Sequence, residues 1–328
     1  AMRDSSPERG AGRAASITIL IRKRSLPHSH KIIIIGGGIC GLTAATTAAR
    51  LGMNTLILTG QVLGGHLVSI EKVDGFPGHP EGIPGFDLCP ATEEAAAEAG
   101  AEFVAEDATA LEETADGWKV SCDNDDYTAP AVILAMGTSL KHLGVPGEQE
   151  YFGKGVSHCA SCDAPMLRGK QVAVIGGGDS ALQEALTLIP ACSKVTIVTN
   201  GKGLTGQAAY IQQIEEASNV EIKTGAKVLE IIGDGSVTGV KITSASGDEV
   251  LSVASVFVFI GLEPASAIVP EELKDVAGFV VADGSMRTPK KGLYAAGTIR
   301  ARSVFRAATA GGEGAAATLS AWGDLAMG

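Results

Sequence analysis

The sequence predicts an α/β protein built from two domains, each with a parallel sheet covered by helices, and three observations support this. Two glycine-rich loops, Gly36-x-Gly38-x-x-Gly41 and Gly176-x-Gly178-x-x-Ala181, each follow a short β-branched run and precede a stretch with helical spacing. A length of 328 residues suits two domains better than one, because single cores stop growing at roughly 250–300 residues. A pair of cysteines, Cys159 and Cys162, lies between the two loops.

The first loop joins a predicted strand at Lys31–Ile35 to a predicted helix at Cys40–Leu51. In this context the three glycines allow a tight turn, close approach to a pyrophosphate and a close helix–strand crossing, with the helix N-terminus facing the anion. The next predicted strand, Leu56–Thr59, does not end in an acidic residue. The ribose contact of a simple NAD site is therefore missing, although the unit is Rossmann-like.

The second loop repeats the pattern with a strand at Lys170–Ile175 and a helix that runs through Leu188. Val195–Val198 reads as the following strand. Alternating stretches predict a β-meander that completes this unit, at Lys227–Ile232, Val237–Thr243 and Val256–Ile260. We therefore predict two Rossmann-like, three-layer domains with β-meanders, the second inserted in the first.

The other segments complete the first domain. Glycines and prolines crowd residues Gly60–Pro90, which predicts a long functional loop over a cofactor. A helix is predicted at Ala91–Ala99. Further strands are predicted at Glu102–Ala105, Trp118–Cys122 and Ala131–Ala135, a last strand ends at Gly297, and a small-residue helix covers Ala307–Ala321.

Composition excludes several classes of function. The formal charge of −11 argues against nucleic acid or an anionic membrane as partner, since both repel an acidic surface. Six cysteines are too few for a disulfide scaffold and indicate a reducing, cytoplasmic location, with Cys40, Cys89, Cys122 and Cys192 as small buried hydrophobes. No metal site is predicted. Residues 1–30 read as a disordered extension, whose apolar run Ile17–Ile21 is too short for a signal peptide or a membrane span.

The pair Cys159-Ala160-Ser161-Cys162 is followed directly by Asp163. Two cysteines at this spacing can close a small ring, and a lowered thiol pKa makes thiolate attack feasible near neutral pH. Asp163 could shuttle the proton that dithiol formation requires. Because a flavin couples electron-pair donors to dithiols, two nucleotide loops around this pair predict a flavin-dependent disulfide oxidoreductase.

In their order along the chain, these features resemble the low-molecular-weight thioredoxin reductases, from about Lys31 to the C-terminus. The matching motifs are Gly36 to Gly41, Gly64-Gly65, Ala135-x-Gly137-Thr138, Cys159-x-x-Cys162-Asp163, Gly176-Gly177-Gly178-Asp179-Ser180-Ala181 and Ala295-Ala296-Gly297.

The resemblance implies an FAD-binding domain at 31–143 plus 263–328, an inserted NAD(P)-type domain at 144–262 that carries the dithiol, and a homodimer. It also implies that Cys162 lies nearest the flavin, Cys159 attacks the substrate disulfide of a thioredoxin-like protein or small molecule, and Asp163 handles the proton. Rotation of the domains would present the dithiol alternately to flavin and partner.

Two sets of cofactor contacts are implied by the resemblance or inferred from the residues. The FAD contacts are Gly36, Gly38, Gly41, Gly64, Gly65, His66, Gly137, Thr138, Gly297, Thr298, Arg306 and Ala307. The possible pyridine-nucleotide loop comprises Gly176, Gly178, Asp179, Ser180 and Ala181.

The sequence departs from the family where NADPH binds. The family carries a His-Arg-Arg run and a later arginine after the strand that corresponds to Val195–Val198, whereas residues 199–205 here contain only Lys202 as a cation. Losing the arginines that clamp a 2′-phosphate would weaken NADPH by orders of magnitude. NAD(P)H is thus a doubtful cofactor, and the donor is predicted to be NADH, a ferredoxin-like protein or a reduced flavin carrier. The second glycine loop is equally explained by strand–helix packing alone.

Smaller departures concern the flavin and the dithiol. Thr298 replaces the family's aspartate on the flavin ribityl chain but still offers a hydroxyl. Arg306 aligns with the family's Arg-Gln pair near the flavin pyrimidine, where its charge would stabilise anionic reduced flavin. His66 replaces a glutamine and His158 precedes the dithiol, so either could tune the thiolate pKa.

Two alternatives remain open from the sequence. One is a dithiol oxidase that forms a disulfide in a small molecule and passes electrons to oxygen, although Asp163 in place of the histidine typical of such relatives disfavours it. The other is a non-catalytic redox-sensing flavoprotein in which the Cys159–Cys162 bond switches conformation.

Overall fold

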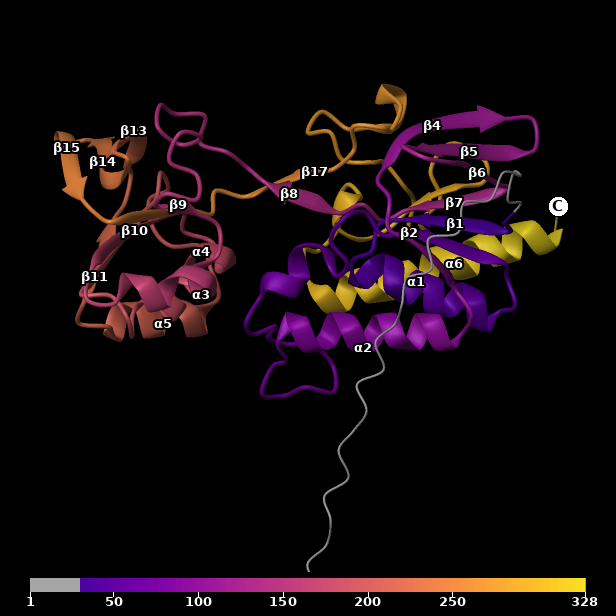
Figure 1. The fold of residues 1–328 in the computed structure, drawn as a ribbon, viewed down its shortest axis with the longest axis horizontal. Coiled ribbons are helices and arrows are strands. Elements are labelled where there is room, and N and C mark those ends of the chain that lie inside the picture. Colours follow the sequence, from indigo (N-terminus) through magenta and orange to yellow (C-terminus); the bar gives the residue numbers. More distant parts are fainter. Residues whose placement is uncertain (1–29, 328) are drawn as a thin grey trace, which may run out of the picture.

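The computed structural model of the protein describes residues 30–327 as two α/β units joined by a narrow connection (Figure 1). The first unit has a five-stranded parallel sheet in the order β18-β7-β1-β2-β3. Its strands are β1 (Ile32–Ile35), β2 (Thr55–Leu58), β3 (Glu102–Val104), β7 (Ala131–Leu134) and β18 (Leu293–Ala295). The predicted extension at 1–30 lies outside the described residues except for His30, which is buried.

Alternate residues of β1 enter two different cores, because successive side chains of a strand point to opposite faces. Ile32 and Ile34 pack against the three helices below the sheet in Figure 1, which are α1 (Ile39–Arg50), α2 (Gly85–Glu98) and α6 (Ala307–Met327). Ile33 and Ile35 pack against the antiparallel sheet above it, formed by β4 (Ala108–Thr114), β5 (Gly117–Cys122) and β6 (Asp126–Ala129). The unit is therefore three-layered.

The second unit repeats this architecture. Its parallel sheet has the order β12-β11-β10-β16-β9, with β9 (Val156–Ser157), β10 (Gln171–Ile175), β11 (Lys194–Val198), β12 (Val220–Lys223) and β16 (Ser255–Val258). One face carries α3 (Ala160–Asp163), α4 (Asp179–Leu188) and α5 (Ala208–Glu216). The other face carries the antiparallel strands β13 (Lys227–Asp234), β14 (Ser236–Ser244) and β15 (Gly247–Ser252).

Two antiparallel strands form the connection between the units. The chain leaves the first sheet after β7 through β8 (Thr138–Leu140) and returns through β17 (Leu262–Pro264), which pairs with β8. Just beyond β8, the buried carboxylate of Glu148 accepts the backbone N–H groups of Leu143 and Gly144 at 2.9 and 2.7 Å. The remaining short elements are the 3₁₀ helices η1 (Gly65–Ser69), η2 (Ala164–Leu167), η3 (Glu271–Leu273) and η4 (Gly297–Ile299).

The predicted fold class, with two Rossmann-like α/β units and one inserted in the other, is confirmed. One part of the predicted meander is wrong, because the strand at Val256–Ile260 is β16, which pairs in parallel with β10 inside the main sheet. Its place in the meander is taken by β15. The predicted loop at 60–90 also ends early, since α2 begins at Gly85 and includes Pro90. The exact domain limits stay a prediction.

Candidate active site

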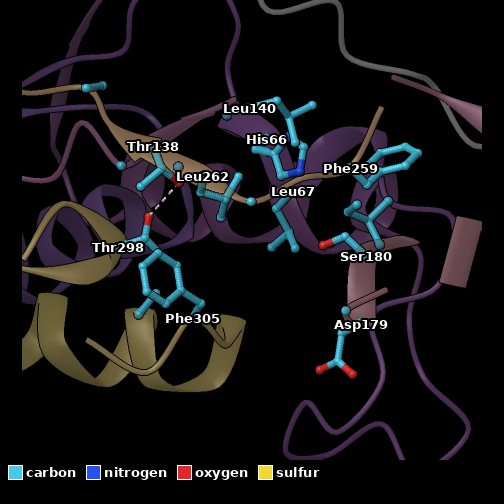
Figure 2. Close-up of a pocket in the computed structure, with 18 of the residues that line it drawn as sticks. His66, Leu67, Thr138, Leu140, Asp179, Ser180, Phe259, Leu262, Thr298 and Phe305 are labelled. Atoms are coloured by element: carbon cyan, nitrogen blue, oxygen red, sulfur yellow. Dashed lines mark hydrogen bonds between the residues drawn. The ribbon is translucent and has the colours of Figure 1, made fainter. Parts of the chain in front are cut away.

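One large cavity, of about 1620 Å³, lies between the two units and is lined by both glycine-rich loops. Figure 2 shows His66, Thr138 and Thr298 of the first unit together with Phe259, Ser180 and Asp179 of the second unit around this space. Most of the predicted cofactor residues line it. They are Gly36, Gly38, Gly64, Gly65, His66, Gly137, Thr138, Thr298, Arg306, Ala307, Gly176, Gly178, Asp179, Ser180 and Ala181.

Gly41 and Gly297 lie behind the cavity wall and serve the packing of its loops. A Cβ atom at Gly41 would lie 1.8 Å from the carbonyl oxygen of Gly36, so only glycine allows α1 to cross β1 this closely. Gly297 has a φ of +75°, and a Cβ there would lie 3.0 Å from Cys40 Sγ. Its N–H donates to the buried carboxylate of Glu313 at 2.8 Å, which is also paired with Arg300.

The first loop has the features required to hold an FAD pyrophosphate. Gly36 has a φ of +117°, a region that L side chains rarely adopt, and a Cβ there would lie 2.3 Å from Ala135 O. Gly38, by contrast, has open space where a side chain would be, with the nearest atom 4.0 Å away. The first turn of α1 contains no acidic residue and no side-chain cap. The residues present therefore fit an anionic dinucleotide.

Hydroxyl groups and a histidine face the inner part of this site. Thr298 Oγ1 lies 3.4 Å from Thr138 Oγ1, so the hydroxyl that replaces the expected aspartate is held beside a second hydroxyl (Figure 2). His66 follows Gly64 and Gly65, whose positive φ values turn the chain into η1. Burial lowers the pKa of His66 below its ordinary value. His66 is therefore neutral at pH 7 and can both donate and accept a hydrogen bond.

The second loop has the same backbone shape but different charge. Gly176 has a φ of +133°, and Thr205 N donates to Gly177 O at 2.7 Å, so residues 199–205 fold back onto the loop. Asp179 lies at the first turn of α4, where its carboxylate accepts the Gln207 N–H at 2.6 Å. The same carboxylate pairs with the Arg306 guanidinium of the first unit at 2.5 Å.

Among residues 30–327, three polar contacts join the units along this side of the cavity. Besides the Arg306–Asp179 pair, Tyr210 donates its hydroxyl hydrogen to Asp74 Oδ2 at 2.8 Å, and the Gln183 amide donates to the carbonyl oxygen of Lys72. No local sequence pattern indicates these contacts, since their partners are far apart in the chain. These contacts hold α4 and α5 against the first unit. They therefore also fix the position of the second glycine-rich loop, which precedes α4.

The end of β11 shows which charges face the position of a nucleotide 2′-phosphate. Among the residues that line this end of the cavity are Thr199, Asn200, Gly201 and Lys227. Lys227 was missed by sequence reasoning because it lies at the start of β13. Among the described residues that line the cavity, the only arginine is Arg306, which is already paired with Asp179.

The dithiol lies outside the cavity, so the structure does not bring it together with the FAD residues. Cys159 and Cys162 are joined as a disulfide with a Cα–Cα distance of 5.4 Å. Cys159 is half-buried and its Sγ accepts the Cys162 N–H at 3.3 Å, whereas Cys162 itself is exposed. Asp163 is half-buried at the end of α3.

The environment of the dithiol includes a histidine cluster at the connection between the units. The ring of His158 lies 5.5 Å from Phe152, 6.0 Å from His142 and 6.4 Å from Phe259, measured between centroids. Its Nε2 atom is buried without a hydrogen-bond partner among the described residues. Burial is the main reason that the pKa of His158 is lowered, and His142 lowers it further.

Residues 30–327 contain neither a candidate metal site nor a helix that could span a membrane. Within that range no cluster of three or more histidine, cysteine or acidic side chains is placed to hold a metal ion. None of the helices found there combines the length and the apolar character that crossing a membrane requires.

Comparison with known proteins places these features in a family. Residues 30–314 match the family described as pyridine nucleotide-disulphide oxidoreductase. The chain is 33% identical to the thioredoxin reductase of Treponema pallidum over 294 residues, which are 89% of this chain and 96% of that protein. The thioredoxin reductase of Lactococcus lactis (FR conformation) superposes with a TM-score of 0.88 at 31% identity, covering 91% of this chain and 99% of that one. A ferredoxin-flavin thioredoxin reductase from Clostridium acetobutylicum superposes with a TM-score of 0.51 at 28% identity, covering 92% and 99%.

Proposed function

The chain belongs to the pyridine nucleotide-disulphide oxidoreductases and, among them, to the low-molecular-weight thioredoxin reductases, and from this we propose that it reduces a thioredoxin-like disulfide with electrons from a donor other than NADPH. As an FAD-dependent disulfide oxidoreductase it moves electron pairs between a flavin and a dithiol. The proposal concerns the electron donor, the disulfide partner and the residues that take part in the reaction.

The observation that carries the proposal is that no arginine lines the cavity at the end of β11 among the described residues. Where a 2′-phosphate would sit, the chain presents Thr199, Asn200 and Gly201, and Thr205 N is bonded to the glycine loop. Lys227 supplies one flexible ammonium group, which lacks the bidentate fork of an arginine. A family member that keeps the dithiol and Asp163 but lacks this clamp needs another source of electrons.

A ferredoxin-like protein is the donor we favour. The relative from Clostridium acetobutylicum is named a ferredoxin-flavin thioredoxin reductase, and this supports such a donor for the present chain. A protein donor delivers single electrons to an exposed edge of the cofactor and needs no nucleotide clamp. We keep the cytoplasmic location and the homodimer as parts of the proposal, as the family resemblance implies them.

The residues divide the work as follows. The first glycine loop and the N-terminus of α1 would hold the FAD pyrophosphate, and the Thr138–Thr298 hydroxyl pair would contact the cofactor at the inner end of the cavity. FAD, when bound, supplies the coupling between one-electron or hydride donors and the dithiol. Cys159, as the thiolate, attacks the partner disulfide, Cys162 then displaces the partner by attacking Cys159 Sγ, and Asp163 exchanges the proton.

The dithiol must move for this cycle to work, because Cys159, Cys162 and Asp163 do not line the cavity. The thin β8–β17 connection offers a hinge for rotation of the second unit. The range of TM-scores, from 0.88 to 0.51 over the same share of the chain, supports different arrangements of the units among relatives.

The test follows the flavin absorbance under anaerobic conditions after adding NADPH, NADH, reduced bacterial ferredoxin or dithiothreitol in separate cuvettes. We expect bleaching by ferredoxin and by dithiothreitol but not by NADPH. In the Cys159→Ser variant, bleaching by dithiothreitol should be lost while bleaching by ferredoxin remains, because only the former passes through the dithiol. Rapid bleaching of the native protein by NADPH would overturn the proposal, and fast reoxidation in air with hydrogen peroxide release would indicate the oxidase direction.

A gain-of-function variant sharpens the test. Asn200 is exposed and lines the cavity at the end of β11, so Asn200→Arg places a guanidinium where the family has one. A charge-assisted hydrogen bond contributes about 1.5–3 kcal/mol, so NADPH affinity should rise about 10-fold or more. The exposed Lys202→Arg change, at a residue outside the cavity lining, is the control that adds no charge.

A further inference from the structure

Glu184 connects the helix behind the second glycine loop to the redox dithiol. It lies on α4, and its Oε2 accepts the N–H of Ala160 at 2.8 Å. Ala160 is the residue directly after Cys159 and is fully buried. Glu184 therefore holds the first residue of the short helix α3 that carries both Cys162 and Asp163.

Two acceptors share the backbone donors of this helix. Cys159 Sγ accepts the Cys162 N–H at 3.3 Å and lies 3.5 Å from Ser161 Oγ, while the Glu184 carboxylate takes the Ala160 N–H. A thiolate at Cys159 would form within the same four residues as the carboxylate contact. Because the carboxylate accepts the N–H of the residue directly after Cys159, both negative charges would lie at the start of α3 and repel each other, and partial burial limits screening by solvent.

Glu184 also reports on the arrangement of the two units. Burial raises the pKa of its carboxyl group, the Ala160 N–H opposes this, and Glu71 of the first unit raises it further. The neighbouring residue Gln183 donates to Lys72 O, next to Glu71. The charge on Glu184 thus depends in part on a residue that would move away when the second unit rotates.

We propose that Glu184 is a positioning residue that makes the Cys159–Cys162 dithiol a stronger reductant. Reduction breaks the S–S bond, takes two electrons from the reduced flavin and adds a proton at each sulfur that does not remain a thiolate. A carboxylate beside Cys159 disfavours the thiolate, so it destabilises the reduced state relative to the disulfide. A less stable reduced state means a lower reduction potential, which favours electron transfer from the dithiol to a partner disulfide. The inference rests on the proposed function only in giving Cys159 the attacking role.

The test uses Glu184→Gln in the full-length, FAD-loaded protein, because the amide oxygen can still accept the Ala160 N–H while the charge is removed. The fraction of reduced dithiol is measured by thiol trapping and mass spectrometry in dithiothreitol redox buffers. At a pH above the pKa of Cys159, where the reduced form carries the thiolate, we expect the equilibrium constant for reduction to rise about tenfold, which is about 30 mV for this two-electron couple. The pKa of Cys159, from the pH dependence of its alkylation rate, should fall. Glu215→Gln, an exposed change on α5 of the same unit, should leave both values unchanged.

Other variants decide between charge and structure. Glu184→Asp keeps the charge, so its potential should stay closer to that of the native protein than the potential of Glu184→Gln. Equal shifts in both variants, or no rise in Glu184→Gln, would overturn the inference. If Glu184→Gln does not fold, Glu184→Met removes the charge at similar length and answers the same question. Because no nucleotide, ferredoxin or thioredoxin enters the measurement, its failure is distinguishable from failure of the proposed donor.

Discussion

The two glycine-rich loops are almost the same in backbone geometry. Gly36 and Gly176 have φ values of +117° and +133°, and a Cβ atom at either would lie within 2.3 Å of a carbonyl oxygen of the neighbouring strand segment. The middle glycines each lie against a threonine, Gly37 against Thr59 and Gly177 against Thr199. Both loops therefore need these glycines because the loop backbone lies directly against the ends of the neighbouring strands.

The loops differ in the charge they carry. The first turn of α1 has no acidic residue, whereas the first turn of α4 has Asp179, bonded to Gln207 N and to Arg306. The comparison teaches that the glycine pattern predicts strand–helix packing, while the surrounding side chains decide whether an anion can bind. We interpret the first loop as a working FAD site and the second as a retained crossing that takes part in contacts between the units.

The largest expected effect comes from adding a methyl group to each loop. Gly36→Ala and Gly176→Ala both force a side chain into a positive φ and against a carbonyl, so each should lower the free energy of unfolding by about 1–3 kcal/mol or more. Only Gly36→Ala should also lose FAD, measured by absorbance of the purified protein. Gly52→Ala is the matched control, since its φ is +74° but nothing lies within 4 Å. Equal loss of FAD from both loop variants would contradict the division of roles.

Sequence reasoning predicted the elements in which local pattern and tertiary structure agree. The β-branched runs of β1 and β10 and the alanine-rich α1 lie where they were expected, within one or two residues. It missed α5 and β12, because the polar, glycine-rich residues 199–207 gave no signal for where the next helix begins. It placed β16 in the meander because an apolar run fits a buried parallel strand and a meander strand equally well.

The candidate site shows the same limit. Each loop lies between a strand and a helix, as predicted, but the sequence did not predict that the two loops, more than a hundred positions apart, line one cavity. The contacts of Asp179 with Arg306 and of Tyr210 with Asp74 depend on how the two units are placed. No local pattern encodes that placement, so these contacts could not be predicted from the sequence. The family resemblance implied that the dithiol alternates between flavin and partner, and in this structure it lies outside the cavity.

A pH experiment probes two histidines, His66 at the cavity and the half-buried His158 beside the dithiol. His66 and His158 both have pKa values lowered, mainly by burial. Below the unfolded-state pKa of about 6.5 the unfolded chain binds more protons than the folded one, so stability should fall as the pH drops below that value and stay flat above it. The slope contributed by each histidine is at most about 1.4 kcal/mol per pH unit.

The measurement is the denaturation midpoint between pH 5 and 8 for the native protein and for His66→Gln. The substitution should flatten the dependence by removing one titrating group. An unchanged profile in His66→Gln would mean that His66 has the same pKa in the folded and in the unfolded chain. His66 would then gain a proton between pH 5 and 8 beside the cavity. The absorbance of bound FAD should therefore also change with pH in this range.

The smallest expected effect concerns the Asp179–Arg306 pair, which distinguishes the second loop from the first. Arg306 is half-exposed, and such pairs contribute about 0.2–1 kcal/mol and weaken with salt. If the pair holds the dithiol away from the flavin, Asp179→Asn should speed anaerobic bleaching by dithiothreitol by at most about fivefold, with the native protein approaching this rate at high salt. Asp248→Asn removes an exposed pair with Lys241 within the second unit and should have no effect. The gain stays small because the Tyr210–Asp74 and Gln183–Lys72 contacts remain. Slower bleaching in Asp179→Asn would instead mean that this carboxylate helps the dithiol to reach the flavin, and the second loop would then have a part in the redox cycle beyond packing.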